Sequence, residues 1–512
     1  MSILLAGVST VLNVSIVFCV HATSLSVSVA YSHVQLYLND LSNISDASVH
    51  FPISRIYLER LIAAIAHLFA YIVKLLLISQ MSTYMFVSGK NWMLSLAELT
   101  AYFRARAIEF KIDYFSTEFF TLTFPKELNP SVIDDLGGTI KIAAQKTKLP
   151  TETIKEAFLK KNKQAQKQVT QTITESGALE GMTKAPDKVL FGVSIYTSDN
   201  TIKTAGGRIQ RYIGSAIKDE LAAKGKKSGF MGVGQDRSEA QLSHVEVLKK
   251  NLVENQAEVI ICIGKAETWV ANTVAVHNPF EFQKRDIYKP NQRAIFGMPP
   301  RLARIMVNLS TCTREKTLLD SFCGVGTILQ EALLEGATVV GMDVNSWCVK
   351  AAEENLEWLA REYNLPLAYF RVVQGSVDKL AQKIGLETMD CIVSEPDLGP
   401  ALRETPTGPY AQKIIEKLQP LFFGFIEEAY HVLKPEGRFV LVTPYIRTRS
   451  HEAVTMPIND KLREAGFRRI YAFTDDMFAE EAPEHGRLMG TPSLVEMDER
   501  HKIGREIHIL QK

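Results

Sequence analysis

The chain has 512 residues, of which 46% are hydrophobic and 22% are charged, and its formal net charge is +1. This composition excludes an intrinsically disordered chain. Together with the length, it predicts two or three globular domains with hydrophobic cores. A net charge near zero neither favours nor excludes nucleic acid as a partner. The six cysteines are scattered without C-x-x-C pairs, so we expect no metal site and a reducing, cytoplasmic environment.

Residues 1–80 differ from the rest of the chain. Residues 2–20 and 61–79 are apolar runs that barely reach the length needed to span a bilayer. No Lys or Arg precedes the first run, which disfavours a signal peptide. Because the chain from Met81 onward begins like a complete domain, we interpret residues 1–80 as an apolar leader that is non-native or dispensable. A membrane anchor and a soluble extension remain open, and contact with a membrane is expected only if residues 1–80 are native.

Residues 81–280 predict an α+β region. Ser95 and Glu98 have the spacing of a capping box at the start of a helix that is expected over 94–104. The periodicity of apolar residues predicts the other elements. Strands are expected over 84–88, within 114–124, and over 189–195, 258–263 and 268–276, helices over 209–221 and 243–251, and a loop over 229–234.

Two basic clusters lie in this region. One follows the helix that begins after Pro150, and the other is spread over residues 203–227. Charge runs are often solvated helix faces, but their repetition favours contacts with phosphate groups. We therefore expect nucleic-acid binding by Lys160, Lys161, Lys163, Arg208, Arg211, Lys226 and Lys227.

Residues 318–345 read as strand, glycine loop, helix, second strand and terminal acid. Gly324 and Gly326 let the backbone turn tightly and approach a ligand closely. Asp343 ends its strand about 20 residues farther on, where a carboxylate can accept hydrogen bonds from both hydroxyls of a ribose. Leu329 stands where a dinucleotide fingerprint has its third glycine, and no Lys-Ser/Thr pair makes a P-loop. A ligand with a ribose but no pyrophosphate fits best, and S-adenosylmethionine is such a ligand.

The segments DSFCGVGT and GMDVN resemble motifs I and II of the class I methyltransferases, especially those that act on nucleic acids. The resemblance implies an α/β, Rossmann-like domain with a seven-stranded sheet whose last strand is reversed, preceded by an α+β RNA-binding region. It also implies S-adenosylmethionine as cofactor. The expected cofactor-binding residues are Asp320, Phe322, Cys323, Gly324, Gly326, Thr327, Asp343, Val344, Ser376 and Val377.

The element order of residues 81–280 resembles the THUMP domain, an RNA-binding module of tRNA-modifying enzymes. Residues 285–310 are similar to the linker and first helix of the tRNA methyltransferases that contain this module. The resemblance implies a THUMP-like region over 81–280, a linker and first helix over 281–310, and a methyltransferase domain over 311–512.

The segment SEPDLGP, Ser394 to Pro400, follows a predicted strand where amino-group methyltransferases carry D/N-P-P-Y/F. In that motif the first side chain and a backbone carbonyl accept hydrogen bonds from the exocyclic amine, and the aromatic ring stacks on the extruded base. In this chain a serine replaces the acid or amide, a glutamate the first proline, and an aspartate the ring, which Tyr410 or Tyr445 could replace. The expected catalytic residues are Ser394, Glu395, Pro396 and Asp397.

The whole pattern resembles the THUMP-containing tRNA guanine-N2 methyltransferases that act at position 10 of tRNA. The resemblance implies methyl transfer to the exocyclic amine of a guanine in tRNA, which forms N2-methylguanosine. Two alternatives stay open. The protein could be a non-catalytic RNA-binding protein with a degenerate site, or an N6-adenine methyltransferase.

Overall fold

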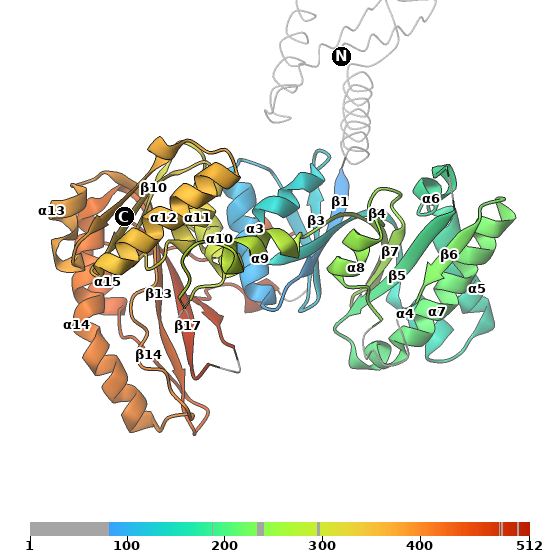
Figure 1. Ribbon diagram of the computed structural model, residues 1–512. Coiled ribbons are helices and arrows are strands. Elements are labelled where there is room, and N and C mark those ends of the chain that lie inside the picture. Colours follow the sequence, from blue (N-terminus) through green and yellow to red (C-terminus); the bar gives the residue numbers. More distant parts are fainter. Residues whose placement is uncertain are drawn as a thin grey trace, which may run out of the picture. The chain divides into compact units, whose positions relative to one another are not determined.

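The computed structural model describes residues 81–512 apart from residues 187, 233–239, 294–296, 481, 483–484 and 499–500 (Figure 1). The interpretation of residues 1–80 as a leader, an anchor or an extension falls outside the described residues. The helices that the structure describes include none with both the length and the apolar character needed to cross a membrane. The described residues form an α/β fold with two mixed sheets.

The first sheet has eight strands among the described residues, in the order β2-β3-β1-β4-β8-β7-β5-β6. Strand β5 is parallel to β6 and β7, and the other neighbouring pairs are antiparallel. The strands are β1 (Ser82–Ser88), β2 (Lys111–Phe115), β3 (Phe119–Phe124), β4 (Thr139–Pro150), β5 (Val189–Thr197), β6 (Ser228–Met231), β7 (Glu258–Ile263) and β8 (Glu267–Val276). The expectation of a loop over 229–234 was therefore wrong at its start, because β6 adds to the edge of the sheet beside β5.

The helices of this region are α3 (Trp92–Ala105), α4 (Thr151–Phe158), α5 (Lys163–Glu175), α6 (Glu180–Lys184), α7 (Asn200–Ala223) and α8 (His244–Lys249). The capping box expected at Ser95 and Glu98 was wrong. Asn91 caps α3 instead, because its side chain accepts from the Leu94 N–H at 3.2 Å and the helix starts almost a turn earlier. Glu98 is buried within α3, and its carboxylate accepts from the N–H groups of Gly137 and Gly138 at 2.7 Å each.

A buried ion pair crosses the first sheet. Lys141 on β4 and Glu258 on β7 both have 0% exposed side chains, and their charged groups lie 2.5 Å apart. The Glu258 carboxylate also accepts from the hydroxyls of Ser194 on β5 and Thr273 on β8, each at 2.6 Å. Because every member of this network has a partner, it fixes the register of four strands in the middle of the sheet.

The second sheet follows the order β11-β10-β9-β12-β13-β17-β15, with β14 paired to β13 and β16 paired to β17. Strand β17 is antiparallel to both of its main neighbours, β13 and β15. The sheet has nine strands among the described residues: seven form this path, and β17, the last strand in chain order, is the reversed one. The expected seven-stranded sheet with a reversed last strand describes this path but not β14 and β16. The strands are β9 (Thr317–Asp320), β10 (Thr338–Asp343), β11 (Phe370–Gln374), β12 (Met389–Ser394), β13 (Leu433–Arg447), β14 (Ala453–Thr455), β15 (Arg468–Arg469), β16 (Leu494–Glu496) and β17 (Ile503–Gln511).

Helices cover both faces of the second sheet. Alternate residues along each strand face opposite sides: Leu318 and Val440 join a core with α10 and α11, whereas Leu319 and Leu441 join a core with α14. The helices are α9 (Pro279–Ile287), α10 (Pro300–Leu309), α11 (Thr327–Leu334), α12 (Ser346–Glu362), α13 (Leu380–Ile384), α14 (Gly408–Val432) and α15 (Asn459–Ala465). Between these two helix layers, the carboxyl ends of the parallel strands β9, β10 and β12 lie at one edge of the sheet. The loops that follow these strands come together there.

The hydrophobic cores do not follow the boundary between the two sheets. Apolar residues between 84 and 136 pack in one core with α10, α11 and one face of the second sheet. Most apolar residues between 149 and 276 have a second core, built by α4, α5 and α7 against β5 and β7, whereas Tyr196 and Ile260 pack in a smaller cluster with Met85 and Phe119. Residues 151–266 leave β4 and return to β8 at one point, since Pro150 pairs with Glu267 and the Thr151 N–H donates to the Ala266 carbonyl at 2.8 Å.

Candidate active site

The glycine loop joins the end of β9 to the start of α11. Gly324 and Gly326 both have positive φ angles, of +52° and +86°, which L side chains rarely adopt. The Gly326 N–H donates to the Cys323 carbonyl at 2.7 Å and closes the turn. A Cβ at Gly326 would also lie 3.3 Å from the Cβ of Ala352 on α12. The loop therefore requires glycine at both positions, as the sequence predicted.

Asp343 at the end of β10 holds this loop in place. Its carboxylate accepts from the Gly324 N–H at 2.9 Å and from the Asn345 N–H at 2.8 Å. A carboxylate has about four lone-pair sites, so further acceptor capacity remains for the hydroxyls of a ribose. Asn345 also caps α12, because its side chain accepts from the Trp347 N–H at 2.9 Å.

Asp320, the last residue of β9, is a buried acid beneath the loop. It accepts from the Phe322 N–H at 3.1 Å. Burial raises the pKa of the Asp320 carboxyl from 3.8 to about 7; the hydrogen bonds from Phe322 and Ser394 lower this pKa, and the charges of Asp343 and Glu395 raise it. A positive ligand charge beside Asp320 would favour its ionised form.

Two serines join the glycine loop to the segment after β12. Ser394 is fully buried, and its hydroxyl oxygen accepts from the Ser321 N–H at 2.9 Å. The Ser321 hydroxyl is also buried and has no hydrogen-bond partner among the described residues. Such an orphaned polar atom at the junction of two loops fits a site completed by a polar ligand. No local pattern in the sequence singles out Ser321.

The other predicted cofactor residues lie either in the glycine loop and the start of α11 or just after the ends of β10 and β11. The Phe322 ring packs edge-on against Phe425 of α14, with centroids 5.0 Å apart, and Cys323 is buried. Thr327 begins α11. Val344 and Ser376 line one shallow pocket of about 560 Å³ beside Asp343 together with Gln374, Gly375, Asp378, Lys379 and Lys383. The side chain of Val377 packs in the core with α14, so only its backbone faces a ligand.

The segment after β12 is held by an arginine from another strand. Arg505 on β17 contacts both carboxylate oxygens of Glu395, and its third nitrogen donates to Glu496 at 3.1 Å. Pro396 is buried. Asp397 is exposed and accepts from the Gly399 N–H at 2.9 Å, which shapes a tight turn. Arg505 was missed by the sequence interpretation, because it lies 110 residues from its partner.

The two tyrosines proposed as substitutes for the missing ring lie on different elements. Tyr410 is in the first turn of α14 and is 50% exposed. Tyr445 is partly buried on β13, paired with Gly504 on one side and Thr455 on the other. Tyr410 is therefore the more accessible of the two for a flipped base.

The segment that leads from β8 to α10 runs along the cofactor loop. Arg285 on α9 donates to Glu331 on α11 at 2.7 Å, and both side chains are buried. Lys289 is also buried and donates to the Thr327 hydroxyl at 3.1 Å. Asn355 donates to the Val325 carbonyl at 2.8 Å and to the Asn291 carbonyl at 3.0 Å. This segment thus holds the first turn of α11 and the glycine loop from outside.

The predicted basic residues form two groups, one around the middle of α7 and the other just after its C-terminal end. Arg208 donates to the Phe158 carbonyl at the end of α4, and the α4–α5 turn carries three lysines (Figure 1). We call this group the α4–α7 patch: Lys160, Lys161, Lys163, Arg208 and Arg211. Lys226 and Lys227 follow the C-terminal end of α7, roughly 20 Å away at 1.5 Å per residue, where Lys226 donates to the Ala185 carbonyl.

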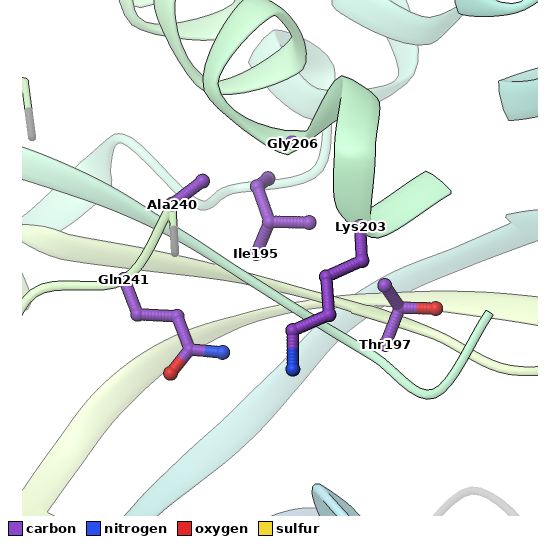
Figure 2. Close-up of a pocket in the computed structure, with 6 residues that line it drawn as sticks. All are labelled: Ile195, Thr197, Lys203, Gly206, Ala240 and Gln241. Carbon is purple, nitrogen blue, oxygen red and sulfur yellow. The ribbon is translucent and has the colours of Figure 1, made fainter. Parts of the chain in front are cut away.

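A separate small pocket lies between the end of β5 and the first turns of α7. Figure 2 shows the Lys203 side chain, with Thr197 and Gln241 near its ammonium group. Its volume of about 10 Å³ suffices for a single water molecule. Lys203 also pairs with Glu118 at 3.1 Å. This pocket is too small for a nucleoside cofactor, so it is not the predicted site.

The glycine loop and the segment Ser394–Pro400 lie in a stretch of the chain that is similar to known proteins. Residues 290–456 match the family described as RMKL-like, methyltransferase domain. The chain is 32% identical over 160 residues to the tRNA (guanine(10)-N2)-dimethyltransferase of Methanothermobacter thermautotrophicus, which covers 31% of this chain and 42% of that protein. It is 30% identical over 202 residues to the enzyme of the same name from Pyrococcus abyssi, covering 39% and 55%.

These alignments span about half the length of the curated relatives, or less. Among solved structures, the chain is similar to TrmN from Thermus thermophilus, with 15% identity, a TM-score of 0.46, and coverage of 84% of this chain and 99% of that chain. The stretch 290–456 contains the glycine loop, Asp343 and the segment Ser394–Pro400. This stretch is therefore similar to known methyltransferase domains.

Proposed function

We propose that this protein transfers a methyl group from S-adenosylmethionine to the exocyclic N2 amine of a guanine in tRNA, in the cytoplasm. The observation that carries the proposal is the joint between Ser321 and Ser394, which holds the glycine loop against the segment after β12. A donor loop and an acceptor loop in contact satisfy the requirement of methyl transfer, because the two reacting atoms must be brought close together. The names of the aligned relatives support guanine and tRNA as the acceptor.

When bound, S-adenosylmethionine supplies a methyl group on a positively charged sulfonium centre. Asp343 would accept hydrogen bonds from the ribose, and the pocket beside Val344 and Ser376 would receive the adenine. The glycine loop would let the backbone approach the cofactor closely. The residues proposed to hold it are Asp320, Phe322, Cys323, Gly324, Gly326, Thr327, Asp343, Val344, Ser376 and the backbone of Val377.

Glu395 would accept a hydrogen bond from the guanine amine and orient it toward the methyl group. Positioning of this kind supplies much of the rate in a transfer between two bound groups. Ser394 ties the segment to the glycine loop, and buried Pro396 shapes it. Asp397 stands where related motifs have a ring, and the loss of one stacking platform costs about 1 to 3 kcal/mol. Of the two tyrosines considered as substitutes, Tyr410 is the more exposed, and we propose that it compensates.

The affinity for S-adenosylmethionine should rise with pH between 6 and 8. The pKa of Asp320 is raised to about 7, so at pH 6 the carboxyl is mostly protonated and gains no attraction from a sulfonium charge. At pH 8 it is ionised, and below pH 7 the affinity should increase by up to about tenfold per pH unit. Titration calorimetry at pH 6, 7 and 8 would measure the affinity for S-adenosylmethionine. S-adenosylhomocysteine, which is uncharged at sulfur, should depend less on pH, and an unchanged profile in Asp320→Asn would contradict the assignment.

We further propose that residues 81–280 contain a THUMP-like RNA-binding region and that the α4–α7 patch contacts phosphate groups. The Lys163→Ala and Arg211→Ala variants should each weaken tRNA binding and reduce the slope of log affinity against log salt by about 1. Binding measured from 50 to 200 mM salt would show this. Arg463→Ala is the control, because Arg463 is an exposed residue of α15 paired with Asp460. Slopes equal to that of the wild type would remove the patch from the RNA interface.

Incubation with unmodified tRNA and labelled S-adenosylmethionine, followed by digestion to nucleosides, tests the proposed function. The expected product is N2-methylguanosine. Labelled N6-methyladenosine would instead support an adenine methyltransferase. Cofactor binding without label in any tRNA would support a non-catalytic RNA-binding protein.

A further inference from the structure

The contact between Arg505 and Glu395 is the most constrained part of the candidate acceptor site. One guanidinium nitrogen contacts each carboxylate oxygen of Glu395, the longer distance being 3.2 Å. The side chains of Arg505 and Glu395 are only 10% and 14% exposed. A bidentate pair of a planar guanidinium and a carboxylate fixes the plane of the carboxylate as well as its position. Glu395 is therefore held in one orientation before any substrate arrives.

Arg505 is itself held from two directions. Its remaining nitrogen donates to Glu496 on β16 at 3.1 Å, and its backbone pairs with Pro444 in the ladder of β13 and β17. Strand β17 lies beside β13, whereas Glu395 directly follows β12. Arg505 thus connects β17, a strand of the sheet, to Glu395 in the loop after β12. This contact restrains the side chain of Glu395.

This arrangement leaves Glu395 able to act. The two hydrogen bonds from Arg505 use one acceptor site on each oxygen, and a carboxylate offers about four such sites. Arg505 itself donates only, so it cannot replace Glu395 as the acceptor for an amine hydrogen.

We propose that Arg505 is a positioning residue that acts through Glu395, keeping its carboxylate aimed at the exocyclic amine of the acceptor base. This inference rests on the proposed function. It assigns a role in methyl transfer to β17, far from the sequence motifs of the site. The competing explanation is that the pair only fastens the segment after β12 to the sheet.

Steady-state kinetics of Arg505→Gln and Arg505→Lys distinguish the two explanations. Arg505→Gln should lower kcat by at least about tenfold, because misorientation of a reacting group is costly, while the Kd for S-adenosylmethionine stays within about twofold. Arg505→Lys keeps the charge but not the bidentate geometry, so its kcat should lie between those of Arg505→Gln and the wild type.

A double variant tests whether Arg505 acts through Glu395. Glu395→Gln with Arg505→Gln should be no slower than Glu395→Gln alone, since the arginine then has no carboxylate to position. Arg468→Gln is the matched control, because it removes an exposed ion pair with Glu436 on the same sheet. Full activity in folded Arg505→Gln would overturn the inference alone. A wild-type protein that methylates no RNA would instead overturn the proposed function and the inference with it.

Discussion

Replacing Glu395 by alanine should lower kcat for methyl transfer by about 100-fold. The substitution removes the carboxylate proposed to face the acceptor amine and leaves the glycine loop, Asp343 and Asp320 intact. The Kd for S-adenosylmethionine should therefore change little. Single-turnover rates with saturating tRNA, compared with calorimetric cofactor affinities, separate the two effects.

The same experiment needs a carboxylate control from a neighbouring loop. Glu404 is an exposed acid that pairs with Arg449 at 3.0 Å, and Glu404→Ala should retain the wild-type rate. Glu395→Gln should be nearly as slow as Glu395→Ala, since an amide is a weaker acceptor and loses the charged bond to Arg505. Undiminished turnover in Glu395→Ala would remove this residue from the mechanism and leave the backbone of the segment as the only acceptor.

Replacing Glu331 by alanine should lower the free energy of unfolding by about 3 to 5 kcal/mol. Glu331 has a fully buried side chain that pairs with Arg285 at 2.7 Å and with Arg304 at 2.9 Å. Its removal leaves two guanidinium groups buried with less compensation. Because α11 and the α9 segment then separate more easily, cofactor affinity should also fall. Denaturant unfolding with and without S-adenosylhomocysteine measures both quantities.

An exposed ion pair provides the comparison for that variant. Glu267 pairs with Lys148 at 2.8 Å, and both side chains are about half exposed. Glu267→Ala should cost less than about 1 kcal/mol, as exposed pairs usually do. If Glu331→Ala were no more destabilising than Glu267→Ala, the buried network would not be a main support of the cofactor helix.

The donor half of the site could be predicted because its signals are local. Within residues 318–345, the glycines, the helix and the terminal acid follow one another at fixed spacing, and the structure has α11 and β10 where they were expected. The bond from the Gly324 N–H to Asp343 spans 19 residues. Backbone geometry and apolar periodicity determine such a unit almost completely.

The remaining features depend on partners that are distant in the sequence. Lys141 was one of several lysines before Pro150, and nothing near it in the chain indicates that Glu258 neutralises it in the core. Nothing near Arg505 in the sequence distinguishes it from other charged residues. Its contact with Glu395 depends on the position of β17 beside β13. The wrong cap of α3 has a different cause. Asn91 and Ser95 both suit a helix start, and burial of Glu98 against Gly137 decided between them.

The place where residues 151–266 leave and rejoin the first sheet has a consequence for how such a chain can change. Pro150 and Glu267 lie opposite each other on neighbouring strands, and the residues between them have a core of their own. The segment therefore has the connectivity of an insertion, whose length and surface can diverge without changing the order of the strands outside it. Selection on the surface of residues 151–266 and selection on the glycine loop can thus act on separate stretches of one gene.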